Sequence, residues 1–354
     1  MFSMDAIRRA TAFLDGRVRR TPLEYSAALS RRAGRDVYLK LENWQVTGSF
    51  KARGALYGLH CLMEEGHAHV ATCSAGNHGK GLAWAARELG AEVTIFVPSS
   101  VDRSKHDAMR AMGARVEKSA YPGYDETEAW ALRTAAERGL PFLSAYDDER
   151  IMAANGGSVA LEVWGQIAAP PPQGAAPTFV FPVGGGGHAA GFVFAMETLC
   201  PGARFVAAQA AASPALKLSL ARGEAVTEMD AADTLAWGLE GGLGARPFEV
   251  LRGQRGGSEP GGSNLGSSDR IHHVALVTEP AIRRAMRFML DEHQIVVEGS
   301  AAVPVAACLA GDVGPEASRS GSHGASARSS LGPLVIFISG RNIDAETYLE
   351  AVSG

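Results

Sequence analysis

The feature that most constrains the fold is a regular alternation of short apolar runs with alanine-rich windows. Runs rich in Val, Ile and Phe are typical of buried strands, and the windows between them have the spacing of amphipathic helices. Because parallel strands need helical crossovers, the alternation predicts open sheets covered on both faces. The predicted strands are VATCS (70–74), EVTIFVP (92–98), ARVEKSA (114–120), LPFLSAY (140–146), TFVFPV (178–183), RFVAAQA (204–210), HHVALVT (272–278) and PLVIFIS (333–339). The predicted helices are 79–90, 103–112, 189–199 and 282–292, and another begins at Lys51.

The alternation breaks near residues 146–149, which predicts two sheets in two domains. A chain of 354 residues is longer than one compact core usually supports. We therefore expect a large domain of residues 1–48 and 148–354, with a small domain of residues 49–147 inserted in it. Two Gly/Ser-rich segments, 252–269 and 311–332, are expected to be surface loops or partly disordered insertions.

Composition narrows the class of partner. Apolar residues make up 46% of the chain, charged residues 20%, and the net charge is −4, so nothing marks a nucleic-acid or membrane-binding surface. A small-molecule ligand is expected instead. The four cysteines are too scattered for a disulfide framework or a zinc ribbon, and the first residues contain no apolar run typical of a signal peptide. A reducing cytoplasm fits these observations.

A run of four glycines separates a predicted strand from a predicted helix in FPVGGGGHAAG (181–191). Consecutive backbone N–H groups at a helix start can converge on a phosphate, although a flexible turn is the simpler interpretation. No Lys-Ser/Thr follows, which excludes a Walker A loop. A dinucleotide fingerprint would need an acid at the end of the next strand, where the sequence has Gln209, so that interpretation is weaker.

A second loop, SAGNHG (74–79), also follows a strand and opens a helix. Its polar side chains and free N–H groups could bind a carboxylate, or could serve only as a helix cap. The third feature is Lys51, placed where a helix begins. A helix start disfavours a cation, so either the side chain extends into solvent, where the penalty is negligible, or this position suits an amine that must lose its proton. Together the amine, the carboxylate-type loop and the phosphate-type loop match what pyridoxal phosphate chemistry on amino acids requires.

With these motifs the chain resembles a known family, the serine/threonine dehydratases and serine racemases of fold type II. The resemblance extends from about Thr21 to Asp344. The resemblance implies a tryptophan-synthase-beta-like fold with pyridoxal 5'-phosphate as cofactor. It is carried by LKLENWQVTGSFKARGA (39–55), SAGNHG, GGGG, TLAWGLEGG (234–242), VEGSAA (297–302) and ISGRNID (338–344). The implied cofactor-binding residues are Lys51, Phe50, Asn77, Gly184, Gly185, Gly186, Gly187, Gly238, Glu298 and Ser339. The implied substrate-carboxylate residues are Ser74, Gly76 and His78.

The resemblance also implies a reaction, the dehydration and deamination of L-threonine or L-serine to a 2-oxo acid and ammonia. Lys51 would be the catalytic residue, because burial and the helix start both lower its pKa and leave a basic amine. Racemase members carry a serine where this chain has Ala75, which favours dehydration over racemisation. No acid follows Gln209, so no bound metal is expected there. A homodimer is the usual assembly for such an enzyme.

Several positions differ from the family pattern and leave the substrate open. His188, Trp237 and Arg341 stand near the implied site, and the simpler interpretation makes His188 a packed imidazole and Arg341 a surface charge. Hydroxyaspartate, a phenylserine or a hydroxyectoine-derived amino acid are alternative substrates. A dinucleotide-dependent oxidoreductase and an inactive ligand-binding relative remain as alternatives of other classes. Because the chain ends shortly after Asp344, no C-terminal regulatory domain is expected.

Overall fold

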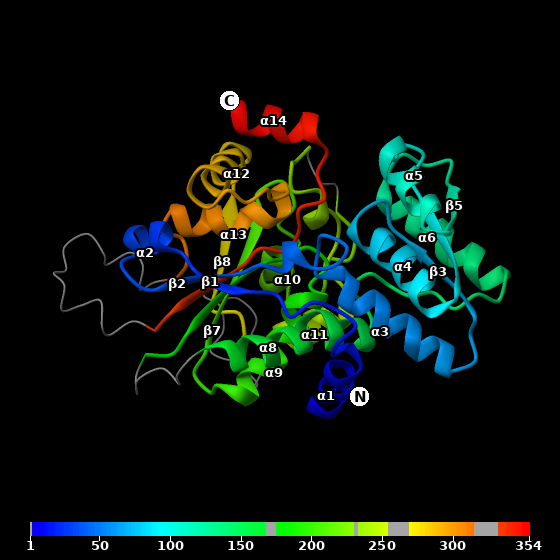
Figure 1. The fold of residues 1–354 in the computed structure, drawn as a ribbon, viewed down its shortest axis with the longest axis horizontal. Coiled ribbons are helices and arrows are strands. Elements are labelled where there is room, and N and C mark those ends of the chain that lie inside the picture. The colour runs from blue at the N-terminus through cyan, green and yellow to red at the C-terminus, as the bar shows by residue number, and fades with distance from the viewer. Residues whose placement is uncertain (1, 168–174, 230–232, 254–268, 315–331) are drawn as a thin grey trace.

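Two sheets organise the protein (Figure 1). The computed structural model describes residues 2–167, 175–229, 233–253, 269–314 and 332–354. Among these residues the larger sheet has six strands in the order β1-β2-β9-β6-β7-β8, and the smaller has three in the order β3-β4-β5. Neighbouring strands run parallel in both sheets except for β1 with β2. The predicted two open, mostly parallel sheets are therefore confirmed.

The larger sheet is built from both ends of the chain. Its strands are β1 (Leu23–Tyr25), β2 (Val37–Lys40), β6 (Thr178–Pro182), β7 (Arg204–Ala210), β8 (His273–Val277) and β9 (Leu334–Phe337). The described helices around it are α1 (Met4–Leu14), α2 (Ala27–Ala33), α7 (Glu149–Met152), α8 (Ser158–Gln166), α9 (Gly187–Leu199), α10 (Ala215–Arg222), α11 (Ala245–Leu251), α12 (Glu279–His293), α13 (Gly299–Leu309) and α14 (Ala345–Ser353). Shorter helical turns are η1 (Glu42–Trp44), the π-helical η2 (Ala153–Gly157) and η3 (Trp237–Leu239).

Helices cover both faces of the larger sheet. Successive residues of a strand point to opposite sides of the sheet, so neighbouring residues of β6 show what packs on each face. Phe179 and Phe181 of β6 belong to a buried cluster with residues of α1, α8, α9 and α11. Val180, between them, belongs to a second cluster with residues of α2, α12, α13 and α14. Figure 1 shows α12 and α13 above the sheet and α8, α9 and α11 below it. Both faces are therefore dry, as the continuous apolar strands predict.

The smaller sheet lies to one side of the larger one (Figure 1). Its strands are β3 (His69–Cys73), β4 (Glu92–Val97) and β5 (Arg115–Lys118), and the neighbouring helices are α3 (Lys51–Glu64), α4 (Asn77–Leu89), α5 (Arg103–Ala111) and α6 (Tyr124–Glu137). The first buried cluster continues into this part of the chain through Ala55 and reaches Leu82 and Ile95. The two sheets thus share one apolar core.

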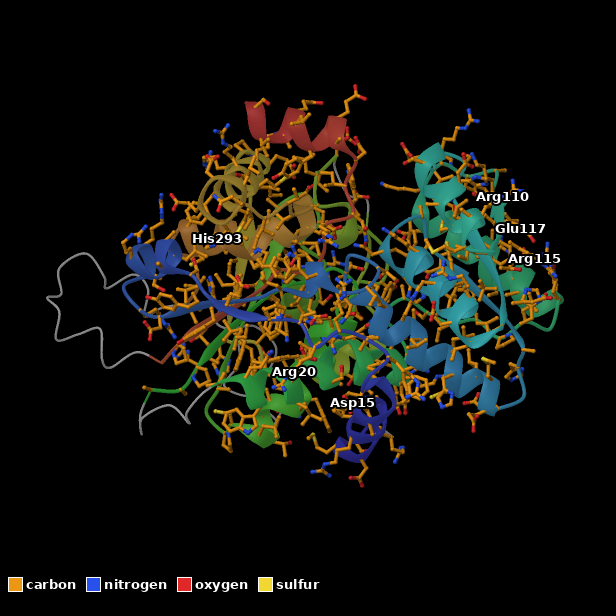
Figure 2. The ribbon with its side chains drawn as sticks, in the orientation of Figure 1. Asp15, Arg20, Arg110, Arg115, Glu117 and His293 are labelled. Atoms are coloured by element: carbon orange, nitrogen blue, oxygen red, sulfur yellow. The ribbon has the colours of Figure 1, made fainter. Side chains whose placement is uncertain are left out.

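The outer edge of the smaller sheet is charged. Strand β5 pairs with β4 alone within the described sheet, and an unpaired strand edge invites unwanted association. Arg115 forms an ion pair with Glu92 at 2.6 Å, and Glu117 forms one with Arg138 at 2.6 Å. Figure 2 shows Arg115 and Glu117 on the outer side of this domain. These exposed charges protect the edge and take no part in the site described below.

One predicted strand is wrong. Residues 140–146 make only an isolated parallel bridge between Phe142 and Ala71. The pairing stops there because the chain turns immediately afterwards, where Ser144 Oγ accepts hydrogen bonds from the backbone N–H groups of Tyr146 and Asp147. The remaining predicted strands and helices are confirmed, within a few residues at their ends. Of the two Gly/Ser-rich segments expected to be loops, residues 254–268 and 315–331 lie outside the described residues.

Candidate active site

Lys51 is the first residue of α3. Its Nζ donates a hydrogen bond of 2.8 Å to the carbonyl oxygen of Ala145. Burial lowers the pKa of the amine to about 8, against an opposing attraction from Glu298. The amine is therefore partly neutral near physiological pH, as the sequence argument required.

The segment before Lys51 joins it to the end of β9. Ser49 forms an antiparallel bridge with Gly340, and the Phe50 N–H donates to the Ser339 carbonyl at 3.2 Å. Phe50 also faces Lys51 Nζ at 5.2 Å from its ring centre. The predicted lysine, aromatic residue and serine are thus brought together from distant parts of the sequence.

Asn77, Glu298 and Asn342 form a hydrogen-bonded ring beside this segment. Asn77 Nδ2 donates to Glu298 Oε1 at 2.8 Å, and Asn342 donates to Asn77 Oδ1 at 2.5 Å and, through its backbone N–H, to Glu298 Oε2 at 3.0 Å. Burial raises the pKa of Glu298 to about 7, which these hydrogen bonds oppose. Gly340 is needed here, because a Cβ would meet the Glu298 carboxylate at 2.6 Å.

The four-glycine loop ends at the start of α9, whose first helical residue is Gly187. Gly186 has φ +87°, a conformation that glycine adopts without strain. The amide nitrogens of Gly184, Gly185 and Gly186 donate to no residue that the structure describes. Free N–H groups at a helix start are the arrangement that binds phosphate.

Close neighbours enforce glycine in this loop. A Cβ at Gly185 would overlap the ring of Tyr146, and one at Gly187 would come within 2.6 Å of the Tyr146 carbonyl oxygen. A Cβ at Gly184 would meet the carbonyl oxygen of Gly238 at 2.9 Å. Gly238 in turn accepts no side chain easily, because a Cβ would lie 3.0 Å from Ser300 Oγ. The loop and Gly238 therefore adjoin one another.

The second loop opens α4. Ser74 is buried, and its Oγ accepts a hydrogen bond of 3.2 Å from the Gly76 N–H. His78 is buried on the first turn of the helix, and neither ring nitrogen has a well-aligned partner among the described residues. Burial and the nearby Lys51 lower the pKa of His78 to about 3, although the Leu143 backbone opposes this. His78 is therefore a neutral ring with unused hydrogen-bonding capacity.

Contacts connect all the residues predicted for the site. Lys51 bonds to Ala145, which precedes Tyr146 beside the glycine loop, and the loop adjoins Gly238. Gly238 and Gly340 both lie next to Glu298, which accepts a hydrogen bond from Asn77, the first residue of α4 within the carboxylate-type loop. These contacts bring the predicted residues together from the start of α3, the glycine loop, the start of α4 and the segment after β9.

Four residues of this site are absent from the sequence-based set: Lys80, Tyr146, Ser300 and Asn342. Asn342 lies in the ISGRNID segment, so its amide was a usable signal. Lys80 follows Asn77 by three residues, which places both on one side of α4. Nothing in the sequence marks Tyr146. The glycines that it covers, Gly185 and Gly187, lie far from it in the sequence and have no side chains that could indicate the contact.

The positions that depart from the family pattern have visible surroundings. His188 is buried against Phe50, Phe181 and Phe337, with ring centres 4.9, 5.9 and 5.2 Å away. It is thus a packed imidazole, as the simpler interpretation held. Arg341 is exposed, and Trp237 lies under Lys105 Nζ at 4.3 Å.

Gln209, which replaced the acid of a dinucleotide site, has a structural task. Its Nε2 donates to the Val183 carbonyl at 3.1 Å, and its Oε1 accepts from the Lys217 N–H at 3.0 Å. Over the described ranges, no three His, Cys, Asp or Glu side chains gather as metal ligands would. Nor does any helix in those ranges have both the length and the apolar character needed to cross a membrane.

Comparison with known proteins gives a consistent result. A family model described as "Pyridoxal-phosphate dependent enzyme" matches residues 14–319. The L-threonine ammonia-lyase of Geobacter sulfurreducens is 34% identical over 98% of this chain and 77% of its own length. The solved structure of maize serine racemase superposes with a TM-score of 0.82 at 27% identity, covering 99% of this chain and 97% of that one. That of a threonine deaminase from T.th. gives a TM-score of 0.78 at 29% identity, covering 97% and 99%.

Proposed function

Because the chain belongs to the pyridoxal-phosphate dependent enzyme family, we propose that it is an ammonia-lyase acting on a β-hydroxy amino acid, with L-threonine or L-serine as substrate. The observation that carries this proposal is Lys51, an amine with its pKa lowered to about 8. It is joined through consecutive contacts to a phosphate-type loop and a carboxylate-type loop. Relatives named as threonine ammonia-lyases and dehydratases support the choice of reaction.

The residues present fit the cofactor. The glycine loop offers N–H groups without partners and tolerates no Cβ, which is what a phosphate cradle needs. His78 is a buried ring without a well-aligned partner, and such a group is costly unless a ligand completes its bonding. Both observations indicate hydrogen-bonding groups whose partners a bound ligand would provide.

The proposed roles carry the family resemblance over to these positions. Lys51 would hold the cofactor covalently, Phe50 would pack against its ring, and Asn77 would donate to its ring hydroxyl. The neutral Ser339 hydroxyl would serve the ring nitrogen without giving it a proton.

The remaining roles are in binding. The cofactor phosphate would be held by Gly184, Gly185, Gly186 and Gly187, and the ring would be bounded by Gly238 and Glu298. The substrate carboxylate would be bound by Ser74, Gly76 and His78.

The chain's own part in the reaction is proton transfer and orientation. When bound, pyridoxal phosphate would supply an electron sink for the pair left at the substrate Cα. Lys51 acts as the base that removes the Cα proton, since a fraction of its amine is neutral near pH 7. Free N–H groups at the start of α4 hold the carboxylate in place. The β-hydroxyl group leaves as water, so that the Cα proton and the hydroxyl group are lost together in the overall balance. The enamine that remains tautomerises to an imine, which water hydrolyses to the 2-oxo acid and ammonia.

A direct assay tests this function. Purified protein with cofactor is incubated with L-threonine, L-serine, hydroxyaspartate and phenylserine, and 2-oxo acid and ammonia are measured for each. We expect both products from at least one substrate, and a loss of at least about 10³-fold in Lys51→Ala, because a base and the covalent anchor disappear together.

Other outcomes of the assay would contradict the proposal. D-serine formed from L-serine without ammonia would identify a racemase and would refute the argument from Ala75. No turnover of any β-hydroxy amino acid by a protein that binds the cofactor would favour an inactive relative. A lysine outside the site, exposed Lys118, provides the matched variant Lys118→Ala, which should retain wild-type turnover.

We also propose the domain division, assembly and compartment expected from the sequence. The separate sheets support a small domain of residues 49–147 inserted in a large one. All four cysteines are free, which suits a reducing cytoplasm. A homodimer is the commonest assembly for soluble enzymes, and light scattering of the eluting holoenzyme would give its mass. A monomer at micromolar concentration would contradict that part of the proposal.

A further inference from the structure

Lys80 occupies an unusual place for a lysine in this molecule. It lies on α4, one turn after Asn77, and its Nζ donates a hydrogen bond of 2.7 Å to Asn342 Oδ1. Burial lowers the pKa of Lys80 and the neighbouring Arg341 lowers it further, whereas attraction to Glu298 opposes both. A partly buried cation costs free energy, and Lys80 directs its hydrogen bond to the neutral Asn342 amide that lies between it and Asn77.

The hydrogen-bond chain from Lys80 has a fixed direction. An ammonium group only donates, so Asn342 must present its oxygen to Lys80. The Asn342 nitrogen then faces the other way, where it donates to Asn77 Oδ1 at 2.5 Å and to the Thr47 carbonyl at 3.0 Å. Because the oxygen of Asn77 is thereby occupied, its nitrogen is the group directed at Glu298.

Glu298 alone does not fix this direction. Burial raises the pKa of its carboxyl group to about 7. A protonated carboxyl group can donate as well as accept, so near neutral pH it tolerates either end of the Asn77 amide. Two groups of fixed polarity therefore orient the Asn342 amide: Lys80, which only donates, and the Thr47 carbonyl, which only accepts. Lys80 is the side chain among them, and so the one that a substitution can remove.

The backbone leaves room for this arrangement. Gly48 has φ +83°, and a Cβ there would lie 2.7 Å from Asn342 Oδ1. The chain of bonds also joins both parts of the protein, because Lys80 and Asn77 belong to α4 whereas Asn342 follows β9. The side-chain amides of Asn77 and Asn342 could each adopt either of two orientations. The hydrogen bonds hold both amides in one orientation, although the two residues are 265 positions apart in the sequence.

We propose that Lys80 is a positioning residue that acts through Asn342 to make the Asn77 amide present its N–H donor to the cofactor's ring oxygen. The inference rests on the proposed role of Asn77. Lys80 itself touches neither cofactor nor substrate in this scheme. Its effect is on which end of the Asn77 amide faces the bound group.

Three variants test the proposal in the full-length protein. Lys80→Met keeps the aliphatic stem and removes the donor, Lys80→Arg keeps a group that only donates, and Lys118→Met is the control at an exposed lysine. For each we measure the dissociation constant of pyridoxal phosphate and the absorbance maximum of the bound cofactor across pH. Thermal unfolding of the cofactor-free forms checks that each variant folds.

We expect Lys80→Met to weaken cofactor binding about tenfold, the size of one lost charge-assisted or misdirected hydrogen bond, and to shift the cofactor absorbance band. Lys80→Arg should stay within about threefold of wild type, and Lys118→Met should match it. In an Asn77→Ala background, Lys80→Met should change affinity by less than about twofold, because its effect passes through Asn77.

The outcomes separate this inference from the function it rests on. Equal affinity and an unshifted band in Lys80→Met would overturn the inference, as would full additivity of the Lys80 and Asn77 changes. If Asn77→Ala itself left affinity unchanged, the proposed role of Asn77 would fail first. A loss in Lys80→Met that Lys80→Arg did not rescue would indicate a packing effect and would also contradict the proposal.

Discussion

At Lys51 the chain holds an amine whose proton is easier to remove than that of an ordinary lysine. Its pKa is about 8 in the folded protein, and an exposed lysine in the unfolded chain has a pKa near 10.4. Between these two values the unfolded chain binds the proton more tightly than the folded one. The free energy of unfolding therefore rises with pH across that window.

A comparison with Lys51→Met measures this contribution. In cofactor-free protein, we expect the wild type to be the less stable of the two at pH 7.5, because folding buries a charged amine. The gap should shrink by about 2–3 kcal/mol on going to pH 10, where the folded amine is already neutral. Urea unfolding at both pH values gives the difference, and a gap independent of pH would show that the amine is not desolvated.

At the scale of elements, the junction between β6 and α9 depends on the absence of side chains. Gly185→Ala should destabilise the cofactor-free protein by about 1–3 kcal/mol, because its Cβ would overlap the Tyr146 ring. Cofactor affinity should fall as well, since the same shift moves the loop N–H groups. Chemical denaturation and cofactor titration measure the two effects.

Gly165→Ala is the matched control, because Gly165 lies in α8 and a Cβ there would meet only the Arg20 guanidinium, at 3.8 Å. It should be neutral or stabilising by up to about 1 kcal/mol. A Gly185→Ala protein as stable as the wild type would show that Tyr146 moves aside freely.

Elements of this kind were the most predictable from the sequence. The continuous apolar run of residues 178–183 and the glycines after it allow few structures other than a buried parallel strand entering a helix. Residues 140–146 show the limit, because their composition suits a strand but the Ser144 turn ends the pairing after one bridge. The contact of Asn342 with Asn77 lay beyond prediction by composition or periodicity, since neither encodes which distant segments meet.

At the scale of the whole molecule, a network of buried ion pairs links α3 to η1, α8 and strand β2 of the larger sheet. Arg53, two residues after Lys51, contacts Glu42 at 2.8 Å and Glu162 at 2.9 Å, and Glu162 also binds Lys40 at 2.5 Å. Although burial opposes it, Arg53 lowers the pKa of Glu42 to about 2. The helix that begins at Lys51 is thus anchored by paired charges.

Removing one partner of such a network leaves a buried charge uncompensated. We expect Arg53→Met to cost about 3–5 kcal/mol in the free energy of unfolding. The exposed pair of Arg87 with Glu88 offers the control, and Arg87→Met should cost less than about 1 kcal/mol. Equilibrium denaturation compares the two, and similar small losses would mean that water enters the network around Glu42.

The bond between Asn77 and Asn342 has a consequence for how the protein is made. The two residues are 265 positions apart, so a chain leaving the ribosome presents Lys51 long before Asn342 has been made. Under the proposed roles, the growing polypeptide would then expose the amine without the opposite wall of the site. Stable capture of the cofactor would follow the synthesis of β9, which makes loading of the enzyme a late event in the life of the nascent chain.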